Sequence, residues 1–139
     1  MENQTLKTDV IFDAPAAKVW QGLTDPIVVK QYFFGTDVKS DWKAGSAITF
    51  SGEWEGKAYG DKGIIIEIEY AKLLKYSYWS SMAGLKDTPP NYVSITYELT
   101  AVNGKTILAI TQEGICGTDA IAKQEQNWHT VFEGLKKLL

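Results

Sequence analysis

The spacing of hydrophobic residues changes once along this chain, and that change most restricts its fold. From residue 46 to residue 113, hydrophobic and polar side chains alternate, which is typical of strands that bury one face of a sheet. From Thr118 the hydrophobic residues recur every three or four positions, which predicts an amphipathic helix of about five turns. The sequence therefore predicts an α+β domain in which an antiparallel sheet wraps around a long C-terminal helix.

Six segments have the features of strands. In the third of them, alternation places Ile64, Ile66 and Ile68 on one face of the strand and Ile65, Glu67 and Glu69 on the other. Short turns connect the later segments, and Asn103-Gly104 is a strong hairpin signal. The six segments span residues 6–12, 46–54, 59–70, 74–79, 93–100 and 106–113, and they predict an antiparallel sheet with one buried face.

Two short helices are expected directly after the first strand. Asp13-Ala14-Pro15 and Thr24-Asp25-Pro26 each place a capping residue before a proline, which is a helix-start signal. The first signal predicts Asp13 or Ala14 as the cap and Pro15 as the first helical residue. One strand, two short helices, five strands and one long helix is the order of the helix-grip fold. The expected architecture is thus one domain over residues 1–139, with a six-stranded sheet.

The charge and cysteine content exclude several functional classes. The net charge is −3 and lysines alternate with acidic residues, so no basic surface for nucleic acid is expected. One His and one Cys, without clustered carboxylates, are too few ligands for a zinc site, and no cofactor is expected. No apolar segment is long enough to insert into a membrane, and the N-terminus lacks signal-peptide features, so we expect a cytoplasmic protein.

Residues 114–117, Gly-Ile-Cys-Gly, lack the strand, spacing and lysine of a phosphate-binding loop. They are expected to form a hinge into the last helix, with Cys116 as a small structural residue.

Several of these segments resemble a known family. Residues 12–15 (Phe-Asp-Ala-Pro), 19–20 (Val-Trp) and 23–26 (Leu-Thr-Asp-Pro) are similar to the N-terminal signature of the START-like (SRPBCC) superfamily. Within it, they most closely resemble the heat-shock-protein-90 ATPase activator homologues. Further similar segments follow in the same order, at residues 41–45, 74–79, 104–108, 112–114 and 127–138.

The resemblance implies a helix-grip fold with a cavity large enough for a ligand. It implies a chaperone partner less directly, because the eukaryotic activator carries its client-stimulating motifs largely in a separate N-terminal domain. The chain also departs from the family, with Asn127-Trp128 where Gly-Trp is common.

Aromatic residues are abundant, with five Trp, seven Tyr and five Phe. The alternation and the helical spacing direct several of them, together with two glutamines, towards a common interior. A packed core accounts for the apolar side chains, whereas buried tyrosines and glutamines need hydrogen-bond partners, which a ligand or water in a cavity would supply. The predicted ligand-binding residues are Trp54, Tyr76, Tyr78, Tyr97, Gln112, Gln124, Trp128 and Phe132.

Three functions are compatible with these features. The first is binding of a hydrophobic or aromatic small molecule; the others are a co-chaperone or stress-response role and an aromatase/cyclase-like activity. We expect a binding protein rather than an enzyme and predict no catalytic residue, because the only histidine, His129, falls at the edge of the buried helical stripe. The long loop at residues 80–91 fits either a lid or a simple connector.

Overall fold

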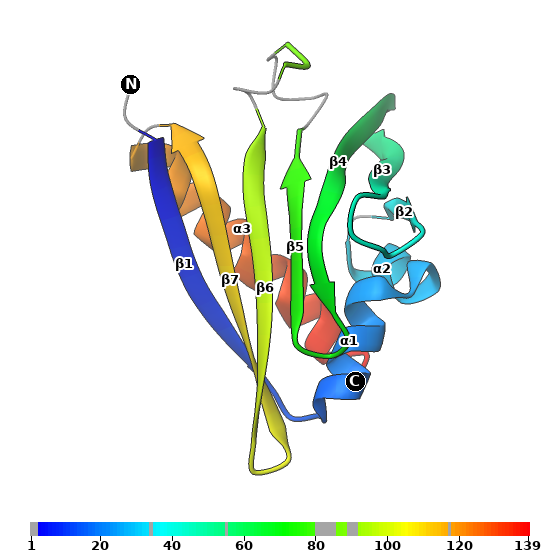
Figure 1. Cartoon of the computed structure of the whole chain (residues 1–139), viewed down its shortest axis with the longest axis vertical. Coiled ribbons are helices and arrows are strands. Elements are labelled where there is room, and N and C mark those ends of the chain that lie inside the picture. Colours follow the sequence, from blue (N-terminus) through cyan, green and yellow to red (C-terminus); the bar gives the residue numbers. More distant parts are fainter. Residues whose placement is uncertain (1–2, 34, 55, 80–85, 89–91, 117) are drawn as a thin grey trace.

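The computed structural model describes residues 3–33, 35–54, 56–79, 86–88, 92–116 and 118–139, without the side chains of residues 3–4, 54, 59, 115–116 and 118–123. A curved antiparallel sheet forms one layer, and the long helix α3 lies diagonally across its inner face (Figure 1). This arrangement confirms the predicted helix-grip architecture. The elements are β1 (Asn3–Phe12), α1 (Ala16–Thr24), α2 (Pro26–Tyr32), β2 (Asp37–Ser40), β3 (Ala47–Trp54), β4 (Lys57–Glu69), β5 (Leu73–Tyr78), β6 (Val93–Val102), β7 (Lys105–Cys116) and α3 (Thr118–Lys136).

The sheet has seven strands in the order β1-β7-β6-β5-β4-β3-β2, one more than the sequence predicted. The additional strand is β2, a four-residue edge strand that pairs with Ile48–Ser51 of β3. Only Val38 of β2 is buried, so this strand is too short to show the alternation from which the others were predicted. Next to the opposite edge strand, β1, strand β7 continues to Cys116, so most of the expected hinge at residues 114–117 belongs to the sheet.

A β-bulge in β4 changes which of its isoleucines are buried. The pairing with β5 shifts between Ile65 and Glu67, so Ile66 is the extra residue. Ile65 is fully buried, whereas Ile64 and Ile66 are 52% and 45% exposed on the outer face. After the bulge Ile68 faces inward and packs against the core. The simple two-residue period of the sequence therefore does not hold across this strand.

The elbow of α1 and α2 closes one end of the sheet (Figure 1). Pro15 is the N-cap of α1, one position earlier than its predicted place in the first turn. Asp25 caps α2 by accepting a hydrogen bond from the Ile27 backbone N–H at 3.0 Å. A methyl group at Gly22 of α1 would lie 2.7 Å from Leu135 Cδ1, so this glycine allows α1 and α3 to approach closely.

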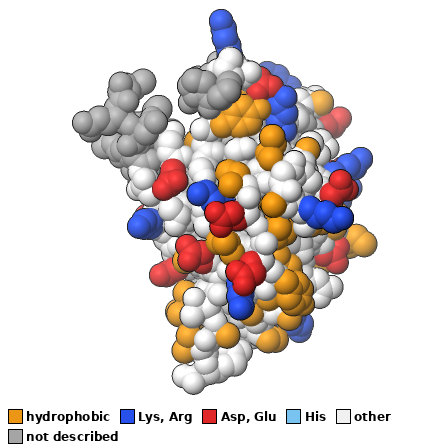
Figure 2. Space-filling view, in the orientation of Figure 1, with side chains coloured by type: hydrophobic (Ala, Val, Ile, Leu, Met, Phe, Trp, Pro, Cys, Tyr) orange, Lys and Arg blue, Asp and Glu red, His pale blue; other side chains and the backbone are white. Residues whose placement is uncertain are grey.

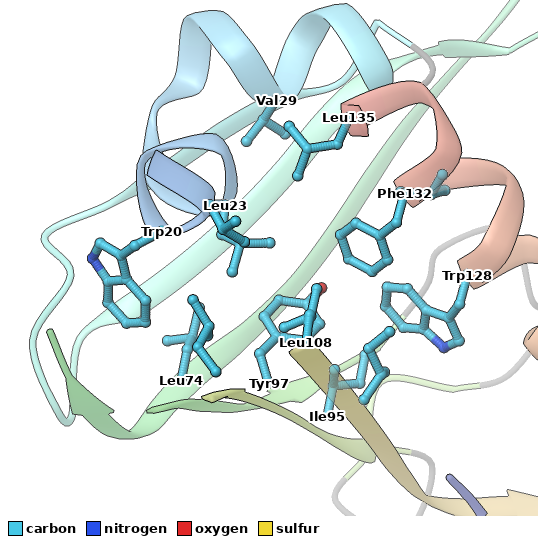
Figure 3. Close-up of a cluster of buried hydrophobic side chains, with 14 of the residues drawn as sticks. Trp20, Leu23, Val29, Leu74, Ile95, Tyr97, Leu108, Trp128, Phe132 and Leu135 are labelled. Atoms are coloured by element: carbon cyan, nitrogen blue, oxygen red, sulfur yellow. The ribbon is translucent and has the colours of Figure 1, made fainter. Parts of the chain in front are cut away.

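The core lies between α3 and the inner face of the sheet. Phe132 and Trp128 project from α3 towards Tyr97 of β6 (Figure 3). The Trp128 and Phe132 rings stack with centroids 5.8 Å apart, and Tyr97 meets the edge of each at 5.9 Å. These contacts fix α3 over the centre of the sheet.

The outer face of the sheet carries interspersed acidic and basic side chains with hydrophobic ones between them (Figure 2). Within the described ranges, no helix combines the length and the apolar character that a membrane span requires.

Candidate functional site

A small hollow lies between helices α1 and α2, the segment that follows α2, and the inner face of strands β2, β3, β5 and β6. The space open to the centre of a water molecule is about 20 Å³, and the hollow is partly open to solvent. The lining residues that the structure describes are all apolar or aromatic, and none of them is charged. They are Leu23, Val29, Tyr32, Phe33, Val38, Trp42, Ile48, Phe50, Leu74, Tyr76 and Tyr97.

Three of the lining residues are tyrosines, each of which carries a hydroxyl group. Tyr76 and Tyr97 are 3% and 5% exposed, and their hydroxyl oxygens lie 2.8 Å apart. The half-buried Tyr32 donates its hydroxyl hydrogen to the Gly22 carbonyl oxygen at 2.7 Å. Burial raises the pKa of all three phenols above the usual tyrosine value, since the charged form would lose its hydration. They are therefore neutral hydrogen-bonding groups at physiological pH.

Two of the predicted binding residues, Tyr76 and Tyr97, line the hollow. Trp128 and Phe132 lie behind Tyr97 and pack against its ring instead of lining the space. Gln112 is buried beside them, and its side-chain oxygen accepts a hydrogen bond from Trp128 Nε1 at 3.0 Å. These three residues support the wall from behind, so the structure divides the predicted group into a lining pair and a supporting cluster.

The other predicted residues lie elsewhere. Tyr78, half-buried, donates its hydroxyl hydrogen to Asp61. Gln124 is half-buried on α3, one turn before Trp128. Trp54 is the last residue of β3, and its side chain lies outside the described part.

Several important residues were missed by the sequence analysis. Asp61 is buried on the inner face of β4, opposite Phe50, which lines the hollow. Asp61 faces inward because it is paired with the inward-facing Phe50. The sequence did not reveal this, because an aspartate within an alternating strand is usually expected to face solvent. Phe33 and Phe50, stacked at 6.2 Å, form one wall. The run of aromatic residues that begins at Tyr32 was the available signal for Phe33. For Phe50 the signal was its place among the inward-facing positions of the alternating segment at residues 46–54.

Trp42 covers the hollow from an unusual backbone conformation. Its φ is +55°, in the left-handed region that bulky residues rarely adopt. The Ser40 hydroxyl oxygen accepts a hydrogen bond from the Trp42 backbone N–H at 3.0 Å, which holds this turn between β2 and β3. The side chain is half-buried and packs against the core. A strained aromatic residue thus lies in the wall that separates the hollow from solvent.

The predicted loop at residues 80–91 falls mostly outside the described residues, and only 86–88 are described. Asp87 forms an ion pair with Lys62 of β4 and accepts a hydrogen bond from the Tyr92 hydroxyl. Trp79 stacks on Tyr92 at 6.5 Å, and its indole N–H donates to the Lys86 carbonyl oxygen at 3.1 Å. Lys62 and Trp79 also form an isolated β-bridge, so this short segment is fastened to β4 at Lys62.

His129 is a half-buried residue of α3 that contacts β1. Its Nε2 lies 2.8 Å from the Thr8 hydroxyl oxygen, which links the helix to the edge strand. In the described part of the chain, no three His, Cys, Asp or Glu side chains converge as metal ligands would.

Comparison with known proteins identifies the family. A solution structure from Cytophaga hutchinsonii is 41% identical, covers 99% of this chain and 95% of its own, and superposes with a TM-score of 0.85. Two more distant structures share the fold. A Rhizobium loti protein is 18% identical, with coverage of 99% and 98% and a TM-score of 0.81. The Aha1 dimer from Colwellia psychrerythraea is 18% identical, with coverage of 100% and 96% and a TM-score of 0.75.

No functionally curated protein matches the chain significantly. The sequence profile of the Activator of Hsp90 ATPase homolog 1-like proteins, however, matches residues 13–139. The chain therefore belongs to the Activator of Hsp90 ATPase homolog 1-like family.

Proposed function

We propose that this protein binds a small hydrophobic or aromatic molecule in the hollow beneath Trp42. The observation that carries the proposal is the composition of the wall, which is apolar and aromatic with a few convergent hydroxyl groups. Ligand sites in proteins commonly have this composition, because apolar contact supplies affinity and a few polar atoms orient the ligand.

Binding requires the hollow to enlarge. A space of about 20 Å³ holds about one water molecule, whereas an engineered cavity of about 150 Å³ accepts benzene. Like Tyr32, Trp42 and Phe33 are half-buried aromatic residues of the wall, so moving these two side chains outward exposes less core than moving a fully buried residue would. The left-handed backbone at Trp42 stores strain, and a rearranged turn could release it. We therefore expect the ligand to enter by displacing the turn that carries Trp42.

The chemistry of the hollow favours binding over proton-transfer catalysis. Burial raises the pKa of Tyr76 and Tyr97, so both phenols keep their hydrogens at physiological pH and act as donors. A general base would require a pKa near the working pH, which burial of a phenol opposes.

Blocking the hollow tests this proposal. In the wild type we expect a saturable rise in the emission of N-phenyl-1-naphthylamine, a neutral probe that fluoresces in apolar surroundings. Val38 lines the hollow from an edge strand, so Val38→Phe should fill the space and weaken probe binding about tenfold or more. Val102→Phe makes the same change at an exposed position and should bind the probe like the wild type.

Circular dichroism would confirm that both variants are folded. Undiminished probe binding by Val38→Phe would place the probe elsewhere and contradict the proposal.

A further inference from the structure

We infer that the ligand is a neutral molecule that presents a hydrogen-bond acceptor to the Tyr76–Tyr97 pair. This inference rests on the proposed function and specifies the chemical class of the ligand. It follows from the number of hydroxyl hydrogens in the hollow and from the charge of its walls.

The Tyr76–Tyr97 pair contains one more donor than it can use. Two phenols carry two hydroxyl hydrogens, and the contact between their oxygens at 2.8 Å uses only one of them. Within the described part of the chain, neither hydroxyl makes a second hydrogen bond to the protein. One hydrogen of the pair is thus left without an acceptor among the described residues.

The pair lies beside the hollow and away from bulk solvent. Both phenols are almost fully buried, and both contribute to the lining. Tyr32 is the third tyrosine there, but its hydrogen already binds the Gly22 carbonyl oxygen. A buried donor without an acceptor is unfavourable, and the great majority of buried polar groups in proteins have a partner. The pair therefore marks the place where a polar atom of the ligand would bind.

The walls also determine the charge of the ligand. Among the described residues no Lys, Arg or His lines the hollow, so a bound carboxylate or phosphate would lose its hydration without gaining a counter-charge. A carbonyl or ether oxygen accepts from a phenol without that penalty. The ligand class is thus a hydrophobic or aromatic ketone, ester, amide, quinone or ether.

A single water molecule is the competing occupant, because the hollow is large enough to hold one. A water could accept the same hydrogen, so the experiment must separate a ligand acceptor from a permanently bound water. Three probes of closely similar shape achieve this: ethylbenzene has no acceptor, acetophenone has a neutral carbonyl, and benzoate is an anion. Dissociation constants would be measured by NMR titration of methyl-labelled protein, in the wild type and in Tyr→Phe variants.

The single and double Tyr→Phe variants should differ in their preference for acetophenone over ethylbenzene. In Tyr76→Phe or in Tyr97→Phe, the remaining hydroxyl keeps a hydrogen for the ligand, so the preference for acetophenone over ethylbenzene should stay within about twofold of the wild type. In the double variant no donor remains, and this preference should fall about fivefold. Ethylbenzene should bind the wild type and the double variant equally, which shows that the hollow itself is intact. Benzoate should bind much more weakly than acetophenone to the wild type.

The outcomes separate this inference from the proposed function. Equal acetophenone preference in the wild type and the double variant would overturn the inference while leaving the hollow as a binding site. Persistence of a hydroxyl-to-water nuclear Overhauser effect in the acetophenone complex would also overturn it, in favour of bound water only. Benzoate binding as tight as that of acetophenone would refute the neutrality of the ligand. Absence of binding by all three probes would overturn the proposed function as well.

Discussion

Replacing Gly63 by alanine is expected to lower the free energy of unfolding by about 3 kcal/mol or more, and the melting temperature by roughly 10 °C. The added methyl group would lie 1.6 Å from the Ser77 carbonyl oxygen of the neighbouring strand, a distance that no side-chain rotation can relieve. The same serine accepts the Ile64 backbone N–H through its hydroxyl oxygen at 3.0 Å. The methyl group would therefore separate β4 from β5 directly beside the wall that carries Tyr76.

Gly60→Ala is the matched control for this prediction. Gly60 lies in the same strand, and a methyl group there would meet nothing within 4 Å. Alanine restricts the unfolded chain more than glycine does, so this variant should change stability by no more than about 1 kcal/mol, in the stabilising direction. Urea unfolding followed by circular dichroism measures both variants. A Gly63→Ala protein as stable as Gly60→Ala would show that the two strands do not approach so closely.

Phe132→Ala should destabilise the protein by about 4 kcal/mol. Phe132 is 1% exposed, and its ring contacts Phe12, Tyr32, Tyr97 and Trp128 at centroid distances between 5.8 and 6.3 Å. Truncation removes this apolar burial and leaves a cavity between α3 and the sheet, which neighbouring rings can only partly fill. Two of the tyrosines that line the hollow, Tyr32 and Tyr97, would also lose a ring that packs against them.

An exposed aromatic residue provides the control. Tyr70 is 70% exposed and contacts Trp20 at 6.1 Å, so Tyr70→Ala should cost no more than about 1 kcal/mol. Both free energies come from denaturant unfolding under the same conditions. A loss below about 2 kcal/mol for Phe132→Ala would mean that α3 is not anchored through this ring.

Most of the fold was predictable because its elements are long enough to display their periods. α3 shows repeated three- and four-residue spacing, and the central strands alternate over six residues or more. β2 was missed because four residues on an edge strand bury only Val38. The bulge at Ile66 was equally hidden, because a local sequence pattern does not contain the pairing between β4 and β5 that creates it.

The site was only partly predictable, since sequence periodicity gives the direction of a side chain but not its partner. Tyr76, Tyr97 and Gln112 do point inward, as expected. Buried tyrosines and glutamines were expected to need a ligand or water, yet Gln112 accepts from Trp128 and Tyr78 donates to Asp61. Internal partners thus account for several of these polar atoms, whereas the tyrosine pair retains one hydrogen that no described residue accepts.

Methyl NMR with acetophenone tests the central claim, ligand binding in the hollow, most directly. The account predicts saturable chemical-shift changes concentrated at the lining methyl groups of Leu23, Val29, Val38, Ile48 and Leu74. The methyl groups of Leu6, which is buried in the core but does not line the hollow, and of exposed Val102 should remain unchanged at the same concentrations. Shifts confined to exposed residues such as Ile64 and Ile66, or no saturable shift at the lining residues, would contradict it.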